Sequence, residues 1–549
     1  KKRFYMGKIA KKYCRKIFVT DDNPRTENPK NIRDSILKGC KKKAVSIASR
    51  KKAIERAINQ LRSNEILLVA GKGHENTQDY GGKILDFSDQ KTIKKIVKKR
   101  KNFFRKESYK NFLLKRTFEN NIENTNYNNV SINTKNIKKN DLFFALKGKK
   151  RDGHKFVKEA INKGAIRSVV SKKIKEVNQN RTIKVKNTFS SLNDLANVTR
   201  DYTLAQIIGI TGSVGKTTLK NLISFSLKNY GNVHYSPQSY NNKFGVPLSL
   251  SNLKKNTEYG VFEIGMDKKG EINKLSKIVK PEIGVITNIS GAHFKNFKTL
   301  KDIAKAKAEI IDNITVGGNI ILNKDDKFFN FFSEKAKNRG INVISFSSKK
   351  KADIFLLGCR KIKNKYRLKL SIKKRFFYFN VKYSMNNFIN NILACVAVLH
   401  SLNLDLYVMR NNFTKFYIPS GRGDIKIIKK FNKKFKFIDE SYNANPLSMS
   451  SAIRNMDFYK KKKDSKKLVF LGDMLELGKK SMKFHKELTN EINRSSIDKV
   501  FVYGKYIQAT FNSLKKNKKG KVFNNLREAH NHFSKIIHNN DLLMVKGSN

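Results

Sequence analysis

One stretch constrains the fold more than any other: residues 205–227 read "AQIIGITGSVGKTTLKNLISFSL". An apolar run typical of a buried parallel strand leads into a glycine-rich loop, and helical apolar spacing follows the loop. The amide groups of such a loop, together with the positive end of the next helix, bind phosphate oxygens. Ile210 stands where the G-x-x-x-x-G-K-[ST] pattern has its first glycine, so a chance glycine turn is the alternative. The coincidence of strand, loop and helix favours nucleotide binding.

The chemistry expected at this loop is the binding of ATP with Mg²⁺. The Lys216 ammonium is placed to reach the outer phosphates, and the Thr217 hydroxyl is placed to ligate magnesium. The loop residues predicted to contact ATP are Gly212, Ser213, Gly215, Lys216, Thr217 and Thr218.

The rest of the chain alternates short apolar runs with stretches of helical spacing, which predicts an α/β fold throughout. Its 549 residues suffice for about three to five domains. Strands are expected at 16–20, 65–73, 467–473 and 499–504, and helices at 31–40 and 51–62. The predicted domains are 1–100, 101–200, a central P-loop domain at 201–420 and a C-terminal domain at 421–549.

The composition excludes several classes of protein. No run approaches the ~18 apolar residues of a membrane-spanning helix. The four cysteines are far apart in the sequence, so neither a disulfide framework nor a thiolate zinc site is expected, and this fits a cytoplasmic protein.

The net charge of +73 is typical of a nucleic-acid-binding protein. However, 94 of the 117 basic residues are lysines, and they are spread through every segment among Asn, Ile, Phe and Tyr. All of these residues have A/T-rich codons, so drift in base composition explains the excess. No zinc-finger spacing or RNA-binding aromatic signature is present. Drift is therefore favoured over a specific nucleic-acid surface, and no specific nucleic-acid partner is expected.

Further motifs accompany the phosphate loop in a fixed order. They are "NDLFFALKGKKRDGHKF" (140–156), "QSYNNKFGVPLSL" (238–250), "VFEIGMDKKGEI" (261–272), "TNISGAHF" (287–294), "AKAKAEI" (304–310), "GRG" (421–423), "DESYNANPLSM" (439–449) and "LGDMLELG" (471–478). In order and spacing they resemble the Mur ligases, the ATP-dependent amide-bond-forming enzymes of peptidoglycan precursor synthesis.

The resemblance covers roughly residues 107–549, short of the family's extreme C-terminus. It implies a uridine-nucleotide domain, a central P-loop ATPase domain and a Rossmann-like C-terminal domain. The implied reaction adds D-alanyl-D-alanine to a UDP-N-acetylmuramoyl tripeptide: ATP phosphorylates the terminal carboxylate, and the dipeptide amine attacks the acyl phosphate.

Three side chains are candidates for the metal shell beside Thr217. Glu263 closes an apolar strand, and its carboxylate suits magnesium because hard cations prefer oxygen. The resemblance adds His293 and also Lys307, whose family position implies a lysine carbamylated by carbon dioxide. The alternatives are a solvated strand-end carboxylate, a hydrogen-bonded loop imidazole and a surface lysine. With Lys216, these three form the predicted catalytic set.

Other roles also follow from the resemblance. Asn387 and Asn390 match an adenine-contacting H-N-x-x-N motif, although Asn386 replaces its histidine. Arg422 and Asp439 match hinge and nucleotide contacts that clamp ATP on domain closure. Asn140 replaces a turn glycine, a mild change because asparagine tolerates the left-handed region. The predicted substrate-binding residues are Asn241, Asn242, Tyr442, Asn443, Asn445 and Lys135, the last standing where relatives often have arginine.

The first 100 residues match a different branch of the family. "TDDNPRTENP" (20–29) and "GKGHENTQ" (71–78) resemble the Rossmann-like C-terminal domain of the Mur ligases that add meso-diaminopimelate. The implied amino-acid-binding residues are Asp22, Asn23, Arg25, Gly71 and Glu75, with Arg25 offering a bidentate fork to a carboxylate. We expect the natural polypeptide to extend upstream of Lys1 with a second P-loop domain, so that it adds diaminopimelate first and the dipeptide second.

Two other functions remain as alternatives to the ligase. One is a basic nucleic-acid-binding P-loop protein, which the lack of a nucleic-acid motif disfavours. The other is an inactive Mur-like scaffold, which the intact "GKTT" and "DESYNANP" motifs disfavour.

Overall fold

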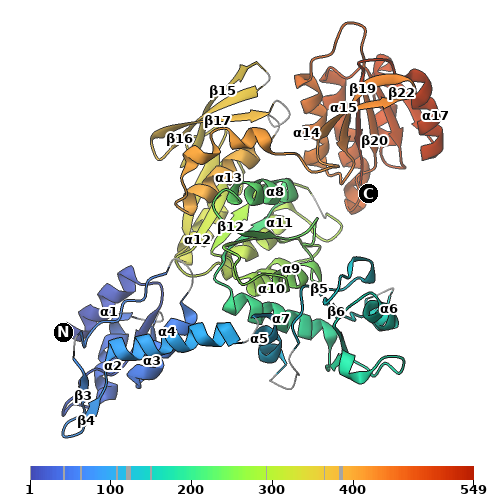
Figure 1. The fold of residues 1–549 in the computed structure, drawn as a ribbon. Helices are drawn as coiled ribbons and strands as arrows, with labels where there is room; N and C mark the ends of the chain where they lie inside the picture. Colours follow the sequence, from blue (N-terminus) through green and yellow to red (C-terminus); the bar gives the residue numbers. More distant parts are fainter. Residues whose placement is uncertain are drawn as a thin grey trace. The chain divides into compact units, whose positions relative to one another are not determined.

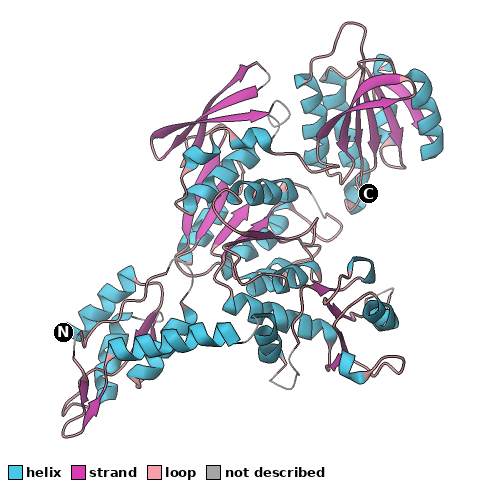
Figure 2. Ribbon diagram, viewed as in Figure 1, coloured by secondary structure: helices cyan, strands magenta, loops and turns pink. Residues whose placement is uncertain are grey.

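The computed structural model describes residues 2–40, 44–61, 65–73, 75–106, 109–118, 125–148, 151–291, 294–363, 365–382 and 388–548. The chain forms two compact units (Figures 1 and 2). The first comprises Lys1–Gln206 with Leu250–Glu258, and the second comprises Ile207–Ser249 with Tyr259–Asn549.

The first unit begins with a small α/β segment whose short strands pair as β1 with β2 in parallel and β3 with β4 antiparallel. Buried aliphatic side chains, among them Val19, Ile54 and Ile58, fill its core. The elements are α1 (Lys2–Tyr13), β1 (Ile17–Val19), α2 (Pro29–Cys40), β2 (Ala44–Ser46), α3 (Arg50–Gln60), β3 (Thr77–Asp79), β4 (Ile84–Asp86) and α4 (Asp89–Lys106).

The strand expected at 16–20 is confirmed as β1, and the two expected helices are confirmed as α2 and α3. The strand expected at 65–73 is wrong. Its described residues form no strand, and Ile66 and Leu68 are 95% and 79% exposed. The two sheets of this segment pair β1 with β2 and β3 with β4, so among the described residues no strand pairs with the apolar run.

The remainder of the first unit is built on a parallel four-stranded sheet in the order β5-β6-β7-β8. Asn140 adopts φ = +65° immediately before the second of these strands, as expected for a residue in place of a turn glycine. The elements are α5 (Tyr109–Thr117), β5 (Val130–Ser131), β6 (Leu142–Phe144), α6 (Val157–Asn162), β7 (Arg167–Val170), β8 (Thr182–Lys184) and α7 (Thr188–Tyr202).

The second unit contains a nine-stranded sheet in the order β10-β11-β9-β12-β13-β14-β15-β16-β17, with parallel pairs from β9 through β12 to β15 and antiparallel pairs from β15 to β17. Helices α8 and α13 pack on it through a continuous apolar core. The elements are β9 (Gln206–Thr211), α8 (Lys216–Leu227), β10 (Val233–Tyr235), α9 (Gly245–Ser251), β11 (Tyr259–Glu263), α10 (Glu271–Val279), β12 (Ile283–Ile286), α11 (Leu300–Lys307), β13 (Asn319–Asn323), α12 (Phe329–Asn338), β14 (Asn342–Ser347), β15 (Ile354–Ile362), β16 (Lys365–Ile372), β17 (Arg375–Lys382) and α13 (Ile389–Ser401).

The same unit ends with a six-stranded sheet in the order β18-β19-β23-β20-β21-β22, in which only the edge strand β18 runs antiparallel. The strands predicted at 467–473 and 499–504 are confirmed as β20 and β21. The elements are β18 (Asp424–Lys430), β19 (Lys433–Glu440), α14 (Pro446–Phe458), β20 (Lys467–Gly472), α15 (Ser481–Arg494), β21 (Lys499–Tyr503), α16 (Gln508–Asn512), β22 (Lys519–Phe523), α17 (Leu526–Ile536) and β23 (Leu542–Lys546).

Within the described part of the chain, no helix combines the length and the apolar character needed to cross a bilayer.

Candidate active site

The predicted phosphate loop connects β9 to α8, as expected from its sequence. Gly212 and Gly215 adopt φ = +144° and +85°, which glycine tolerates best. A Cβ atom at Gly212 would overlap the Thr287 hydroxyl, so no larger residue fits there without a shift of the loop. The Lys216 ammonium folds back over the loop and donates to the Gly212 carbonyl at 2.8 Å. The glycine turn before α8 therefore has a lysine ammonium beside it, as phosphate-binding loops do.

A buried carboxylate lies at the start of α8. Glu263, at the end of β11, is 1% exposed, and its two oxygens have different partners. Thr217 Oγ1 donates to Oε2 at 2.6 Å, and Asn241 Nδ2 donates to Oε1 at 2.7 Å. The Lys220 ammonium lies 3.9 Å from Oε2. The structure thus brings together three of the predicted site residues, from α8, the loop before α9 and β11.

Two lysines that interact with each other electrostatically are desolvated. Lys307, the last residue of α11, is 1% exposed, and its pKa is lowered well below 10.5 by burial and by the charge of Lys216. Burial also lowers the pKa of Lys216, with Arg422 acting in the same direction and Glu263 opposing them. Burial therefore favours the neutral amine form of Lys307.

Arg422 connects the C-terminal segment to this site. Its Nη2 donates to Ser239 Oγ at 3.2 Å, and that hydroxyl lies 3.3 Å from Thr217 Oγ1. The guanidinium carbon sits 3.8 Å from the ring centroid of Tyr442. Burial lowers the pKa of Arg422, and the charge of Glu263 opposes this shift. The predicted hinge arginine and the predicted loop tyrosine are therefore in contact.

Asp439 organises the hinge turn. Its carboxylate accepts hydrogen bonds from the Gly421 amide at 3.1 Å and from the Ser441 hydroxyl at 2.6 Å. Burial by itself would raise the pKa of Asp439, but the hydrogen bonds from Ser441, Ser420 and Gly421 outweigh it and lower the pKa.

Several predicted substrate residues also shape the backbone. Asn242 Oδ1 accepts from the amides of Phe244 and Gly245 at the start of α9, and Asn445 caps α14 in a capping box with Ser448. Asn443 and Tyr442 are exposed in the loop after β19. Among these predicted substrate residues of the second unit, only Asn241 donates to a site carboxylate.

An asparagine that the sequence interpretation missed contacts the phosphate loop. Asn391 Nδ2 donates to the Gly215 carbonyl at 3.2 Å, whereas the predicted Asn390 is exposed on α13. The sequence motif alone could not separate the two neighbouring asparagines, because the direction of each side chain depends on how α13 packs. Asn387 and His293 lie outside the described residues. Lys135, in the first unit, is exposed in a short turn.

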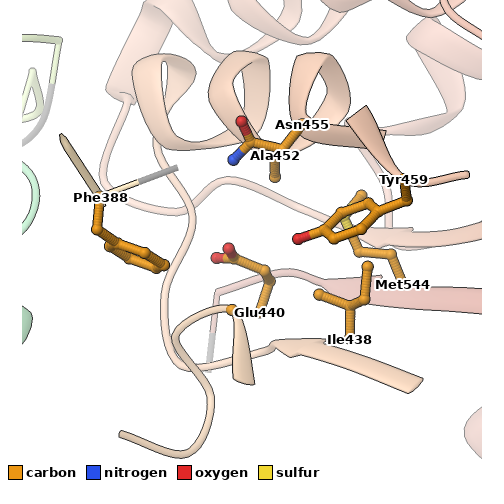
Figure 3. A pocket seen from close by; sticks show the side chains of 8 residues that line it. Phe388, Ile438, Glu440, Ala452, Asn455, Tyr459 and Met544 are labelled. Atoms are coloured by element: carbon orange, nitrogen blue, oxygen red, sulfur yellow. The ribbon is translucent and has the colours of Figure 1, made fainter. Parts of the chain in front are cut away.

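A small pocket lies beside the hinge turn, in the second unit. Figure 3 shows the Glu440 carboxylate pointing into the space among Phe388, Asn455 and Tyr459. The Lys546 ammonium lies 3.2 Å from Glu440 Oε2. One side of this carboxylate is therefore neutralised while the other faces the pocket.

In the first unit, four of the five predicted amino-acid-binding residues gather around a buried lysine. Asn23 Nδ2 donates to Glu75 Oε2 at 2.7 Å, and Lys72 Nζ donates to Asn23 Oδ1 at 3.0 Å. A Cβ atom on Gly71 would lie 2.7 Å from Asp22 Oδ2. Arg25 is exposed at φ = +53°, and its amide donates to the Asp79 carbonyl at 3.0 Å. Lys72 was missed, although it lies within the "GKG" turn of the predicted motif.

Comparison with known proteins agrees with this architecture. Residues 126–200 match the Mur ligase family catalytic domain, and residues 210–399 match the Mur ligase middle domain. The Mur ligase glutamate ligase domain matches twice, at 1–73 and at 425–549. Together with the relatives described next, these matches establish that the chain belongs to the Mur ligase family.

Similar relatives include enzymes of one branch of that family. The chain is 34% identical over 424 residues to the UDP-N-acetylmuramoyl-tripeptide–D-alanyl-D-alanine ligase of Rickettsia prowazekii, covering 77% of this chain and 93% of the relative. It is 31% identical over 395 residues to the Bacillus subtilis enzyme of the same name, covering 70% and 81%. Among solved structures, MurF from Acinetobacter baumannii superposes with a TM-score of 0.70 at 25% identity, covering 80% of this chain and 95% of that one. MurF from Thermotoga maritima in complex with ADP gives 0.65 at 26% identity, covering 78% and 95%.

Proposed function

We propose that this protein is an ATP-dependent carboxylate–amine ligase that joins D-alanyl-D-alanine to a UDP-N-acetylmuramoyl tripeptide. The observation that carries the proposal is the buried hydrogen-bonded set of Thr217, Glu263 and Asn241 beside the phosphate loop, reached by Arg422 through Ser239. The names of the most similar relatives support the choice of substrates.

The residues present fit ATP and Mg²⁺. The glycine loop offers amides to phosphate oxygens, and the Thr217 hydroxyl and Glu263 carboxylate are the oxygen donors that magnesium prefers. Among the described residues, no three His, Cys, Asp or Glu side chains form a metal cluster. Thr217 and Glu263 would therefore hold the ion together with phosphate oxygens and water, and His293 and Lys307 are the further proposed ligands. When bound, the ion would neutralise negative charge on the phosphates.

In the proposed reaction, the terminal carboxylate of the tripeptide attacks the outer phosphorus of ATP, ADP leaves, and an acyl phosphate forms. The dipeptide amine then attacks the acyl carbon, and phosphate leaves. Lys216 and Arg422 supply positive charge where negative charge builds up in the first step. Tyr442 and Asn443 lie on an exposed loop suited to binding the incoming dipeptide.

We propose that Lys307 carries a carbamate. Its amine is buried, and burial favours the neutral form that reacts with carbon dioxide. The product offers carboxylate-like oxygens in place of an ammonium that would repel the metal.

We further propose that residues 1–100 form an amino-acid-binding domain of a second ligase activity, the addition of meso-diaminopimelate. The glutamate ligase domain match at 1–73 and the gathering of Asn23, Lys72 and Glu75 support this role. The other proposed domains are the uridine-nucleotide domain at 101–200, the ATPase domain at 201–420 and the C-terminal domain at 421–549, in a cytoplasmic enzyme.

The experiment that tests the main proposal measures phosphate release from ATP by the purified chain. Release is expected only when both the UDP-muramoyl tripeptide and D-alanyl-D-alanine are present, and Lys216→Ala should abolish it. Lys228→Ala, which changes an exposed lysine just after the same helix, is the matched control. ATP hydrolysis stimulated by polynucleotides but not by the substrate pair would favour the nucleic-acid alternative. No turnover under any of these conditions would favour the inactive scaffold.

A further inference from the structure

The last strand of the C-terminal sheet ends in a buried lysine that holds a neighbouring loop. Lys546, which is 2% exposed, donates through Nζ to Glu440 Oε2 and to the Asn443 carbonyl, each at 3.2 Å. Two residues later, the Ser548 hydroxyl donates to Asn443 Oδ1 at 3.3 Å and to the Ala444 carbonyl at 3.2 Å. The loop at 440–444 is therefore anchored from one side by the end of β23.

The same arrangement recurs in the first unit. Lys72, whose side chain is fully buried, donates to Asn23 Oδ1 at 3.0 Å and lies 3.7 Å from Asp22 Oδ1. In both places the lysine of a "KG" pair contacts an acidic residue and an asparagine at or just after the end of a strand, through the Asn443 carbonyl in one case and the Asn23 side chain in the other. The two segments match the same domain model. The recurrence indicates a built feature and not a chance contact in one domain.

The position of Lys546 in the sheet suggests its purpose. In open parallel sheets, ligands bind beyond the carboxyl ends of the strands, and both β19 and β23 end at this edge. A buried ammonium is costly unless it is paired, so an apolar residue would serve better if packing were the only need. Lys467 provides the contrast. This lysine is also buried, but it is the first residue of β20 and lies at the amino ends of the parallel strands. Its ammonium donates to Met456 O and Ser496 Oγ, away from the loop at 440–444.

We infer that Lys546 is a positioning residue for the amine substrate: it fixes the loop at 440–444 so that Tyr442 and Asn443 meet the incoming dipeptide. Lys72 has the corresponding role for the loop at 22–25 and an amino acid with a free carboxylate. This inference rests on the proposed ligase function, and it adds to that function a residue outside the phosphate and metal site.

The test compares Lys546→Met, Lys546→Arg and the matched control Lys467→Met in the full chain. Steady-state kinetics should show the KM for D-alanyl-D-alanine rising about tenfold in Lys546→Met, because the charged hydrogen bonds that fix the loop are lost, with the KM for ATP within about twofold. Lys546→Arg should restore part of the affinity for D-alanyl-D-alanine, because the arginine guanidinium can donate to both partners. Lys467→Met should lower the melting temperature without changing the ratio of the two KM values.

Hydrogen exchange separates failure of this inference from failure of the proposed function. The amides of residues 440–444 should exchange faster in Lys546→Met and not in Lys467→Met, whether or not the chain turns over the substrate pair. Equal effects of the two methionine variants on both KM values, or unchanged exchange in the loop, would overturn the inference. If Lys546→Met does not fold, the double variant Lys546→Met with Glu440→Gln replaces it in both measurements. The second substitution removes the carboxylate charge that Lys546→Met leaves unpaired.

Discussion

The Thr217 hydroxyl donates a 2.6 Å hydrogen bond to Oε2 of Glu263, joining the first turn of α8 to the end of β11 across 46 residues of sequence. Both groups are buried, and the second carboxylate oxygen is occupied by Asn241. A carboxylate fixed in this way beside a phosphate loop is preorganised for a cation, because little further ordering is required when the cation binds.

Glu263→Gln should therefore reduce turnover more than it reduces stability. The amide keeps the size of the side chain but loses the charge that a magnesium ion requires, so kcat should fall by about 10²–10³-fold. The magnesium concentration that gives half-maximal kcat should also rise. Glu271→Gln, at the half-buried start of α10, is the control. A Glu263→Gln enzyme with ordinary kcat and magnesium dependence would remove this residue from the metal shell.

Lys307→Ala should abolish turnover if the lysine carries a carbamate, because the oxygens that the carbamate offers are removed. Formate or acetate added at high concentration should restore part of the activity by supplying carboxylate oxygens in the vacated space. The control is Lys305→Ala, an exposed lysine on the same helix. Wild-type activity in Lys307→Ala would show that the carbamate assignment is wrong.

Asn391→Ala should raise the KM for ATP about fivefold, the effect of about 1 kcal/mol from one neutral hydrogen bond. The substitution removes the hydrogen bond from Asn391 Nδ2 to the Gly215 carbonyl, which measures 3.2 Å. Asn390→Ala tests the adenine contact implied by the sequence motif in the same assay. A larger effect of Asn390→Ala than of Asn391→Ala would favour the motif over the observed loop contact.

Lys110→Met should change how stability depends on pH. Burial, aided by the charge of Lys254, lowers the pKa of Lys110 from 10.5 to about 7 in the folded chain. Between those pH values the unfolded chain binds the additional proton, so Lys110 makes stability rise with pH, by at most about 1.4 kcal/mol per pH unit. Urea unfolding at pH 7 and pH 9 should show a smaller rise in the variant. An identical rise in both proteins would mean that Lys110 titrates normally.

The sequence by itself determined those elements in which the local pattern of residues agrees with the burial in the folded chain. The phosphate loop is one of them, because glycine at 212 and 215 and the run of apolar residues before it specify strand, turn and helix without distant partners. The α/β class, β20 and β21 followed in the same way from short apolar runs closed by turn residues.

Tertiary structure decided the remainder, because contacts between distant residues leave no periodic signal. The apolar run at 65–73 has the composition of a strand, yet none of the strands in the described part of the chain pairs with it. Asn391 and not Asn390 faces the phosphate loop, since the direction of a side chain depends on how α13 packs against α8. In the sequence, nothing distinguishes Lys72 and Lys546 from the other lysines of the chain, 94 in all. Only the folded chain buries their ammonium groups, and a buried charge must find the acidic and amide partners that define its role.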